Sequence, residues 1–368
     1  MRCPGVKRMG TATASPPENC APPTKKFTHV KLFCLSPVTS TSSLHAGDRQ
    51  QQGNQKMTGH FTRVAGVCFV LVASPLSAAT FGSNTVVYSL GNEGQTLVTL
   101  AAPGQGTPSG VTLDFNGMLR SLDSIAYRPQ TGQLYGYDNE DDVVYLIDPQ
   151  TGATTKIVEA LGTTSNDDLG FDFNNVLDAA RIVTAEEENI VFFPNKMPPT
   201  LEPKTPLAYV PGDENEGVNP NIVANAYTNA VPNATSTAQF VIDSDWDILA
   251  TLGNNAGTLE TVGDLYLDGM AFDITEDIGF DILSFMEGDN TAYALLTERM
   301  TGGQSIYEVP LIADMMGRIN LVEVTALDRS FGTLNGLAVA PSAVPLPAAL
   351  PMLVAGLAAL GFARRRRG

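Results

Sequence analysis

Short hydrophobic runs that alternate with polar positions dominate residues 80–343 and predict a domain built from strands. Runs such as 84–90, 133–137, 143–148 and 154–158 are rich in β-branched and aromatic residues, and Gly, Asn, Asp or Pro bounds each of them. No long stretch shows the 3.6-residue period of an amphipathic helix. The pattern is typical of many short antiparallel strands joined by tight turns.

One motif recurs as an apolar strand that ends in Asp, followed by a turn and a Thr-rich return strand. It occurs at residues 144–155 and, more loosely, at residues 240–243 with 257–262. The Asp side chain can accept hydrogen bonds from turn amides, and Gly supplies a positive φ. The Pro-rich segment 197–206 interrupts the pattern, so we expect it to be a loop insertion between strands.

A second motif is a small residue followed by an alternating apolar strand. It occurs at Ser124–Pro129, Gly170–Asn174, Gly269–Ile274 and Gly336–Pro341. The spacing is 46 residues from Tyr127 to Phe173 and 101 from Phe173 to Ile274, about twice as long. Repeats of about 40–50 residues are the unit of a β-propeller. The sequence therefore predicts an all-β, propeller-like domain of five or six blades; a pair of β-sandwiches is the alternative.

Residues 57–79 have the three-part layout of a secretory signal peptide. A short, weakly basic start leads into a 13-residue apolar run and a small-residue exit, and we expect cleavage between Ala79 and Thr80. Because a signal peptide begins near a chain terminus, we expect translation to start at Met57. Residues 1–56 are then a start-site artefact. In the alternative interpretation they are a disordered extension, and the apolar run is a short buried helix.

Residues 344–368 have the layout of a sorting tail. The motif Val344-Pro345-Leu346-Pro347-Ala348 opens a 20-residue, mostly apolar stretch that ends at Ala363, which is long enough for one transmembrane helix. The cluster Arg364-Arg365-Arg366-Arg367 follows and would stay on the cytoplasmic side. The tail resembles the VPLPA variant of the PEP-CTERM tails of Gram-negative bacteria. That resemblance implies cleavage by an exosortase-type enzyme and release to the cell surface or outside the cell; an ordinary single-span anchor is the alternative.

Charge and composition change sharply at Thr80. Residues 80–343 hold 37 acidic and nine basic side chains, whereas all four Cys and all three His precede Thr80. Without Cys or His, this part cannot form a Ser-His-Asp or Cys-His catalytic centre, a Cys/His zinc site or a disulfide. Its charge excludes binding of nucleic acid through a basic surface. Carboxylate chemistry, oxygen-bound cations and surface recognition remain.

Several short motifs follow one another in the order typical of one exported bacterial family. They include Leu134-Tyr135-Gly136, Ile147-Asp148-Pro149-Gln150-Thr151-Gly152-Ala153, Gly170-Phe171-Asp172-Phe173-Asn174, Pro211-Gly212-Asp213 and Gly257-Thr258-Leu259. From about Leu122 to Asp281 the chain resembles the family catalogued as domain of unknown function 4394. The resemblance implies a propeller-like, exported protein and supplies no catalytic residue. The chain departs from that family at Val191-Phe192-Phe193-Pro194, where a polar strand end is expected.

Two acidic clusters are candidate calcium sites, because calcium binds six to eight oxygen ligands of the kind that clustered Asp and Asn supply. The candidate ligands are Asp138, Asp141, Asp142, Asp243, Asp245 and Asp247. The first three lie in a predicted hairpin turn and could equally form a solvated acidic loop. A third oxygen-rich loop, residues 213–221, holds Asn and Asp side chains that could simply close turns.

In the second cluster, Asp occupies every other position (Asp243, Asp245 and Asp247), as acidic residues do at the start of an EF-hand loop. It is not an EF-hand, because Ile248 and Asn254 stand where that loop needs Gly and Glu. In an extended segment its three carboxylates would share one face, which is either a cation site or the solvent-exposed side of an edge strand. Trp246 would then point the other way, into the core or against a sugar ring, and the core is the favoured place.

Together these features favour a structural or binding protein of the cell surface or extracellular polysaccharide matrix. Calcium is the cofactor that the acidic clusters would hold. An exosortase-type enzyme and, before processing, the inner membrane are the expected partners. The alternative is a surface enzyme that cleaves carbohydrates or lactones with paired carboxylates or calcium. The sequence contains no nucleophile elbow, phosphate loop or dinucleotide fingerprint, so it assigns no catalytic residue.

Overall fold

The computed structural model describes residue 82 and residues 84–100, 107–160, 162, 164–165 and 168–342. The predicted extension, signal peptide and sorting tail lie outside the described residues. Within the described ranges, no helix is long and apolar enough to cross a membrane.

Twenty strands in the described part of the chain form five antiparallel units of four, here called blades. A parallel pair, residues 264–267 with residues 318–321, joins two of these blades into one ten-stranded sheet. Blade 1 contains β22 (Asn335–Pro341), β1 (Thr85–Gly91), β2 (Thr96–Leu100) and β3 (Ser109–Thr112). Blade 2 contains β4 (Ser124–Arg128), β5 (Gln133–Asp138), β6 (Val143–Ile147) and β7 (Thr154–Glu159). Blade 3 contains β8 (Leu169–Asn174), β9 (Ala179–Thr184), β10 (Asn189–Phe193) and β11 (Thr200–Pro203).

Blade 4 contains β13 (Ile222–Tyr227), β14 (Gln239–Asp243), β15 (Ile248–Leu252) and β16 (Thr258–Leu267). Blade 5 contains β18 (Gly279–Leu283), β19 (Thr291–Thr297), β20 (Gln304–Glu308) and β21 (Arg318–Ala326). Two short strands, β12 (Ala208–Tyr209) and β17 (Met270–Ala271), pair with β16, and a single 3-10 turn, Asn254–Ala256, precedes it.

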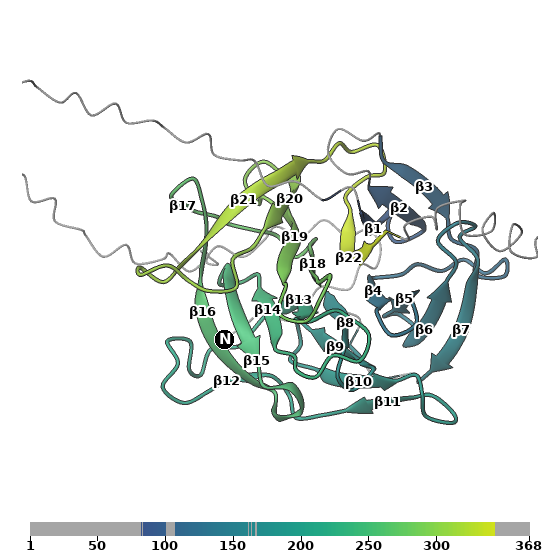
Figure 1. Cartoon of the computed structure of the whole chain (residues 1–368), viewed down its shortest axis with the longest axis horizontal. Helices are drawn as coiled ribbons and strands as arrows, with labels where there is room; N and C mark the ends of the chain where they lie inside the picture. Colours follow the sequence, from purple (N-terminus) through teal and green to yellow (C-terminus); the bar gives the residue numbers. More distant parts are fainter. Residues whose placement is uncertain are drawn as a thin grey trace, which may run out of the picture. The chain divides into compact units, whose positions relative to one another are not determined.

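The five innermost strands form a closed ring. Each contacts the next in the order β22, β4, β8, β13, β18 and back to β22, and the outermost strands lie at the rim (Figure 1). This is the arrangement of a β-propeller with five blades. The predicted all-β, propeller-like fold is therefore confirmed, and the alternative of two β-sandwiches does not describe it.

Blade 1 joins the two ends of the described chain. Strand β22 pairs antiparallel with β1, and the register places Thr85 opposite Pro341 and Val87 opposite Val339. The last strand thus completes the blade that the first strand begins, which closes the ring with backbone hydrogen bonds.

Glycines let the innermost strands approach closely. A Cβ atom on Gly170 would lie 2.4 Å from the backbone nitrogen of Asn225, and one on Gly279 would lie 2.4 Å from the carbonyl carbon of Gly336. Three of the four predicted small-residue strands are innermost strands. The prediction for Gly269 is wrong, because that residue lies in the β16–β17 hairpin at the rim and Gly279 begins the innermost strand of blade 5.

The innermost strands all run in the same direction, so the ring has a start face and an end face. On the start face, the side-chain amide of Asn335 donates a hydrogen bond to the carbonyl oxygen of Asp123. The backbone N–H of Gly336 donates to the carbonyl oxygen of Ile278. On the end face, neighbouring turns are also bonded to each other. The start face therefore collects the residues that precede the innermost strands, together with the turns between the second and third strands of every blade.

The axis of the ring is closed. Its centre, lined by side chains such as Phe171, Phe280 and Leu337, has no space for a water molecule. At the end face, residues 228–238 cross from blade 4 to blade 2, where the backbone N–H of Asn233 donates to Gln130 at 3.0 Å.

Two local predictions were wrong. The Pro-rich segment 197–206 is not a pure insertion, because its residues 200–203 form β11 and pair with β10. The strand that returns after Asp243 is β15, and residues 258–267 form the following strand, β16. The first error arose because β11 is only four residues long, and the second because the return strand follows Asp243 after the short turn 244–247.

Candidate functional site

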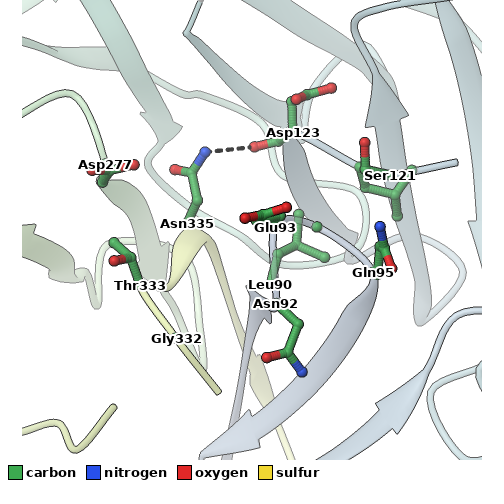
Figure 2. Close-up of a pocket in the computed structure, with 12 residues that line it drawn as sticks. Leu90, Asn92, Glu93, Gln95, Ser121, Asp123, Asp277, Gly332, Thr333 and Asn335 are labelled. Carbon is green, nitrogen blue, oxygen red and sulfur yellow. Dashed lines mark hydrogen bonds between the residues drawn. The ribbon is translucent and has the colours of Figure 1, made fainter. Parts of the chain in front are cut away.

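A cavity of about 680 Å³ opens on the start face between blades 1, 2 and 5 (Figure 2). Its volume is in the range of small-molecule sites, about 300–1,000 Å³. The lining residues are Leu90, Asn92, Glu93, Gly94, Gln95, Ser121, Leu122, Asp123, Asp277, Gly332, Thr333 and Asn335.

The β1–β2 turn forms one wall and presses against the segment before β4. The backbone N–H of Leu122 donates to the carbonyl oxygen of Gly94 at 3.1 Å. Gly94 has a φ of +75°, and a Cβ atom there would lie 2.1 Å from the Leu122 carbonyl oxygen. Only glycine fits this contact without strain, because an L side chain disfavours positive φ and would overlap the backbone.

Asn335, at the start of the ring-closing strand β22, ties blades 1 and 2 together at the cavity. Its Nδ2 donates to the carbonyl oxygen of Asp123 at 3.1 Å, and its own carbonyl oxygen accepts from Ser89 Oγ at 3.1 Å. In Figure 2, Asp277 lies on one side of Asn335, and Asp123 and Glu93 lie on the other. Three carboxylates from three blades thus border one cavity.

Among the carboxylates that border the cavity, Asp123 has the pKa that burial raises to near neutrality. Its side chain is half-buried, and its Oδ2 accepts the backbone N–H of Asn139 at 2.7 Å. Burial raises the pKa of Asp123 to about 6, the Asn139 bond opposes that shift, and the charges of Asp138 and Glu140 add to it. Desolvation and then Glu276 raise the pKa of Asp277, but this residue stays exposed, so Asp123 is the stronger acid–base candidate.

The cavity lining favours neutral or cationic ligands that carry hydroxyl groups. Carboxylates, the amides of Asn92, Gln95 and Asn335 and the hydroxyls of Ser121 and Thr333 supply acceptors and donors. No basic or aromatic side chain is among the described lining residues. Anionic ligands would meet uncompensated negative charge here.

Sequence reasoning missed Glu93, Asp123 and Asp277 because they do not form a cluster along the chain. A positional signal was present, however. Asp123 directly precedes the small residue that begins β4, and Asp277 lies two residues before Gly279, which begins β18. Aligning the repeats on their small residues would have placed Asp123 at the start face but not Asp277, because the sequence pattern selects Gly269 instead of Gly279.

The first predicted cluster lies in the β5–β6 turn, as expected, and its carboxylates bind protein groups. Arg120 forms an ion pair with Asp138 at 3.1 Å and also contacts Asp141. Asp142 is buried and accepts from the hydroxyl of Tyr137 at 2.8 Å and from the backbone N–H of Thr164 at 2.9 Å. These contacts hold the turn in place.

The second predicted cluster is not an extended segment but the turn between β14 and β15. Asp243 is buried and accepts from the Tyr209 hydroxyl at 2.8 Å, whereas Asp247 has a φ of +55° and accepts from the backbone of Ile274 at 3.0 Å. Asp245 is exposed, so the three carboxylates do not share one face. The core placement of Trp246 is also wrong, because at this turn its side chain is 43% exposed.

The third loop closes turns, as its simpler interpretation predicted. Asp213 accepts from the backbone N–H of Thr261 at 2.7 Å and from its hydroxyl at 2.8 Å. The two candidate calcium clusters lie in different blades. Among the residues that the structure describes, no group of three or more His, Cys, Asp or Glu side chains is placed to hold a metal ion. Calcium binding stays a prediction.

Fold and cavity together define a class: a propeller-like β protein with an acidic, polar pocket on one face of the ring. The chain belongs to the family described as domain of unknown function (DUF4394), whose sequence pattern matches residues 96–328. A search of curated proteins found no match.

Solved structures resemble the chain only distantly. A streptogramin B lyase shares 10% identity at a TM-score of 0.35, covering 67% of this chain and 68% of the lyase. Virginiamycin B lyase from Staphylococcus aureus shares 13% identity at a TM-score of 0.33, covering 61% of this chain and 65% of the enzyme. An auxiliary nutrient binding protein from Bacteroides ovatus shares 13% at a TM-score of 0.37, with 57% and 56% covered. These scores carry no argument about activity.

Proposed function

We propose that the protein is an exported binding protein that holds a neutral, hydroxyl-rich ligand of the saccharide class in the start-face cavity. One observation carries the proposal: a cavity of about 680 Å³ whose lining combines carboxylates, amides and hydroxyls from three blades. Such groups provide the donors and acceptors that a sugar hydroxyl needs. A site assembled from three rigid blades is also pre-organised, which lowers the entropic cost of binding.

The proposed place of action is the cell surface or the extracellular matrix. The signal-peptide pattern of residues 57–79 and the VPLPA-type tail of residues 344–368 support export and processing by an exosortase-type enzyme. The excess of acidic side chains would keep the protein soluble, and divalent cations would bridge the protein to anionic polysaccharide of the matrix.

Calorimetric titration of the protein with a panel of neutral oligosaccharides tests the proposal. We expect at least one to bind, and we expect the double variant Glu93→Gln/Asp277→Asn to bind about tenfold more weakly, since hydrogen bonds to charged groups are worth about 1.5–3 kcal/mol. Asp245→Asn is the matched control, because Asp245 is exposed on the same face outside the cavity. Absence of binding across the panel, or equal loss in the control, contradicts the proposal.

The raised pKa of Asp123, about 6, favours one second candidate, a surface hydrolase acting on carbohydrates or lactones. A carboxyl group that titrates near neutral pH can donate a proton to a leaving group. Product analysis separates the two functions. Released fragments that disappear in Asp123→Asn support the hydrolase, whereas retention without product supports the binding protein.

A further inference from the structure

Exposed apolar side chains gather on the end face, opposite the cavity. Val176 and Leu177 lie in the β8–β9 turn and are 44% and 63% exposed, and Phe285 and Met286 lie in the β18–β19 turn and are 52% and 66% exposed. We call these four residues the end-face patch.

The two turns belong to one continuous surface because residues 228–238 bind both of them. Asn175, which precedes Val176, donates from Nδ2 to the Thr228 carbonyl oxygen at 3.4 Å. The backbone N–H of Ala230 donates to Ser284 Oγ at 3.0 Å, and Ser284 precedes Phe285. The end-face patch thus borders a connected platform that closes the axis of the ring.

The platform and its two bordering turns contain few charged side chains. Residues 228–238 contain no charged side chain. Asp178, beside Leu177, is paired with Arg128 at 2.6 Å, and Glu287, beside Met286, accepts the backbone N–H groups of Thr235 and Ser236 at 3.0 and 2.9 Å. Hydrogen bonds from neutral groups leave Glu287 ionised, so the exposed Glu287 and Asp289 are the negative charges of the β18–β19 turn.

The start face also exposes apolar side chains, among them Met300 at 84% and Trp246 at 43%, but it is the more acidic face. The turn between the second and third strands of every blade carries at least one carboxylate there: Glu93, Glu140, Glu186, Asp245 and Glu298. A strongly acidic surface is repelled by the anionic headgroups of a bacterial membrane, whereas an apolar surface with few acidic side chains is repelled less.

The described chain also leaves from the end face. Strand β22 ends at Pro341, and the backbone N–H of Ser342 donates to the Asn84 carbonyl oxygen at 2.6 Å, which fixes the exit point. The apolar run 344–363 begins only two residues further on. At no more than about 3.6 Å per residue, it starts within about 7 Å of that point.

We propose that the end-face patch docks on a lipid bilayer while the tail is attached, so that the start-face cavity points away from the membrane. The exit point of the described chain, the smaller number of acidic side chains and the four exposed apolar side chains all lie on the same face. Leu, Phe and Met side chains at an interface insert into the boundary between headgroups and acyl chains. This inference goes beyond ligand binding and concerns how the tethered protein is oriented.

The lone tryptophan offers a built-in control, because Trp246 is exposed on the start face. The full chain with its tail is reconstituted in bilayers of anionic and zwitterionic lipids with brominated acyl chains. In a Trp246→Phe background, Leu177→Trp and Met286→Trp each place one reporter in the end-face patch. We expect both reporters to shift to the blue and to lose emission to bromine, and we expect Trp246 of the unsubstituted protein to keep its emission.

Three results overturn the inference. If the tryptophans introduced at positions 177 and 286 show neither a blue shift nor quenching by bromine, the end-face patch faces water. A blue shift without quenching shows that the tail itself or a second copy of the chain covers the patch. A chain that does not partition into bilayers lacks the tether. None of these results bears on the cavity, so titration of the unsubstituted protein with oligosaccharides keeps the two proposals separable.

Discussion

Asp172 and Asp281 occupy equivalent positions, each following a Gly-Phe pair on an innermost strand, and each binds the next innermost strand. Asp172 Oδ2 accepts the backbone N–H of Tyr227 at 2.7 Å, and Asp281 Oδ2 accepts that of Val339 at 2.5 Å. Two buried carboxylates therefore link blade 3 to blade 4 and blade 5 to blade 1. Burial and then the charge of Asp281 raise the pKa of Asp172, and burial raises the pKa of Asp281 to about 7.

This pair makes stability depend on pH. Because the folded-state pKa values exceed the unfolded value near 3.8, the folded protein binds more protons, so the free energy of unfolding falls as pH rises from about 4 to 7. A tenfold difference in proton affinity between the folded and unfolded states corresponds to about 1.4 kcal/mol. Chemical denaturation at pH 5 and pH 8 measures the effect. Asp281→Asn should flatten the dependence, since an amide keeps an acceptor oxygen without titrating.

Asp245→Asn controls for the removal of negative charge, because Asp245 is exposed on the start face. If Asp245→Asn flattens the pH dependence as much as Asp281→Asn does, general charge repulsion causes it and the assignment to the buried pair is wrong.

Gly94→Ala should destabilise the protein and distort the cavity. The new methyl group would overlap the Leu122 carbonyl oxygen at a backbone with positive φ, and we expect a loss of about 3 kcal/mol or more. Gly117→Ala is a close control, because Gly117 has a φ of +74° with nothing within 4 Å of a Cβ atom. Its cost should be about 1 kcal/mol from backbone strain alone. Equal losses in thermal melts would show that the Leu122 contact contributes nothing.

Arg128→Gln should weaken the contact between blades 2 and 3. Arg128 Nε donates to Asp178 Oδ1 at 2.6 Å, its Nη2 also pairs with that carboxylate, and Nη2 donates to Asn195 at 2.8 Å. Because the guanidinium is mostly buried, we expect a loss of about 2 kcal/mol in the free energy of unfolding. Lys156→Gln, which removes an exposed ion pair with Glu159, should change nothing measurable. A similar loss in both variants would contradict the special role of Arg128.

Ligand affinity at the start-face cavity should rise with pH through about 6, where Asp123 ionises. A carboxylate accepts hydrogen bonds from hydroxyl groups with both oxygens, whereas the protonated acid has less acceptor capacity. Titration of the strongest oligosaccharide at pH 5 and pH 7 measures this, and Asp123→Asn should remove the difference. Affinity that falls between pH 5 and pH 7 would instead show that the protonated acid binds the ligand.

The sequence predicted the repeat better than the site. Alternation and turn residues located strands such as β5, β6 and β7 within one residue of their ends, because hydrophobic alternation and Gly or Asp turns are local signals. The number of blades could be determined only from the folded ring. In the sequence, Gly269 has the pattern of a residue that begins an innermost strand, although it lies in the β16–β17 hairpin. Only contacts with neighbouring strands show that Gly279 fills that position.

Clustering in sequence was a poor guide to chemistry here. Asp138 and Asp243 stand out in the sequence, yet an arginine and a tyrosine hydroxyl respectively bind their side chains. The cavity instead takes single carboxylates from positions 93, 123 and 277, which the ring brings together. Long-range closure decides such a site, and no local window contains that information.

The pairing of β22 with β1 also dictates when the ring can form. Thr85 finds its partner Pro341 only after nearly every described residue has been synthesised. A partly synthesised chain therefore lacks the β1–β22 pairing, and the ring cannot close until β22 is available. Such late closure is compatible with the proposed export, in which the chain would cross a membrane unfolded before β22 pairs with β1.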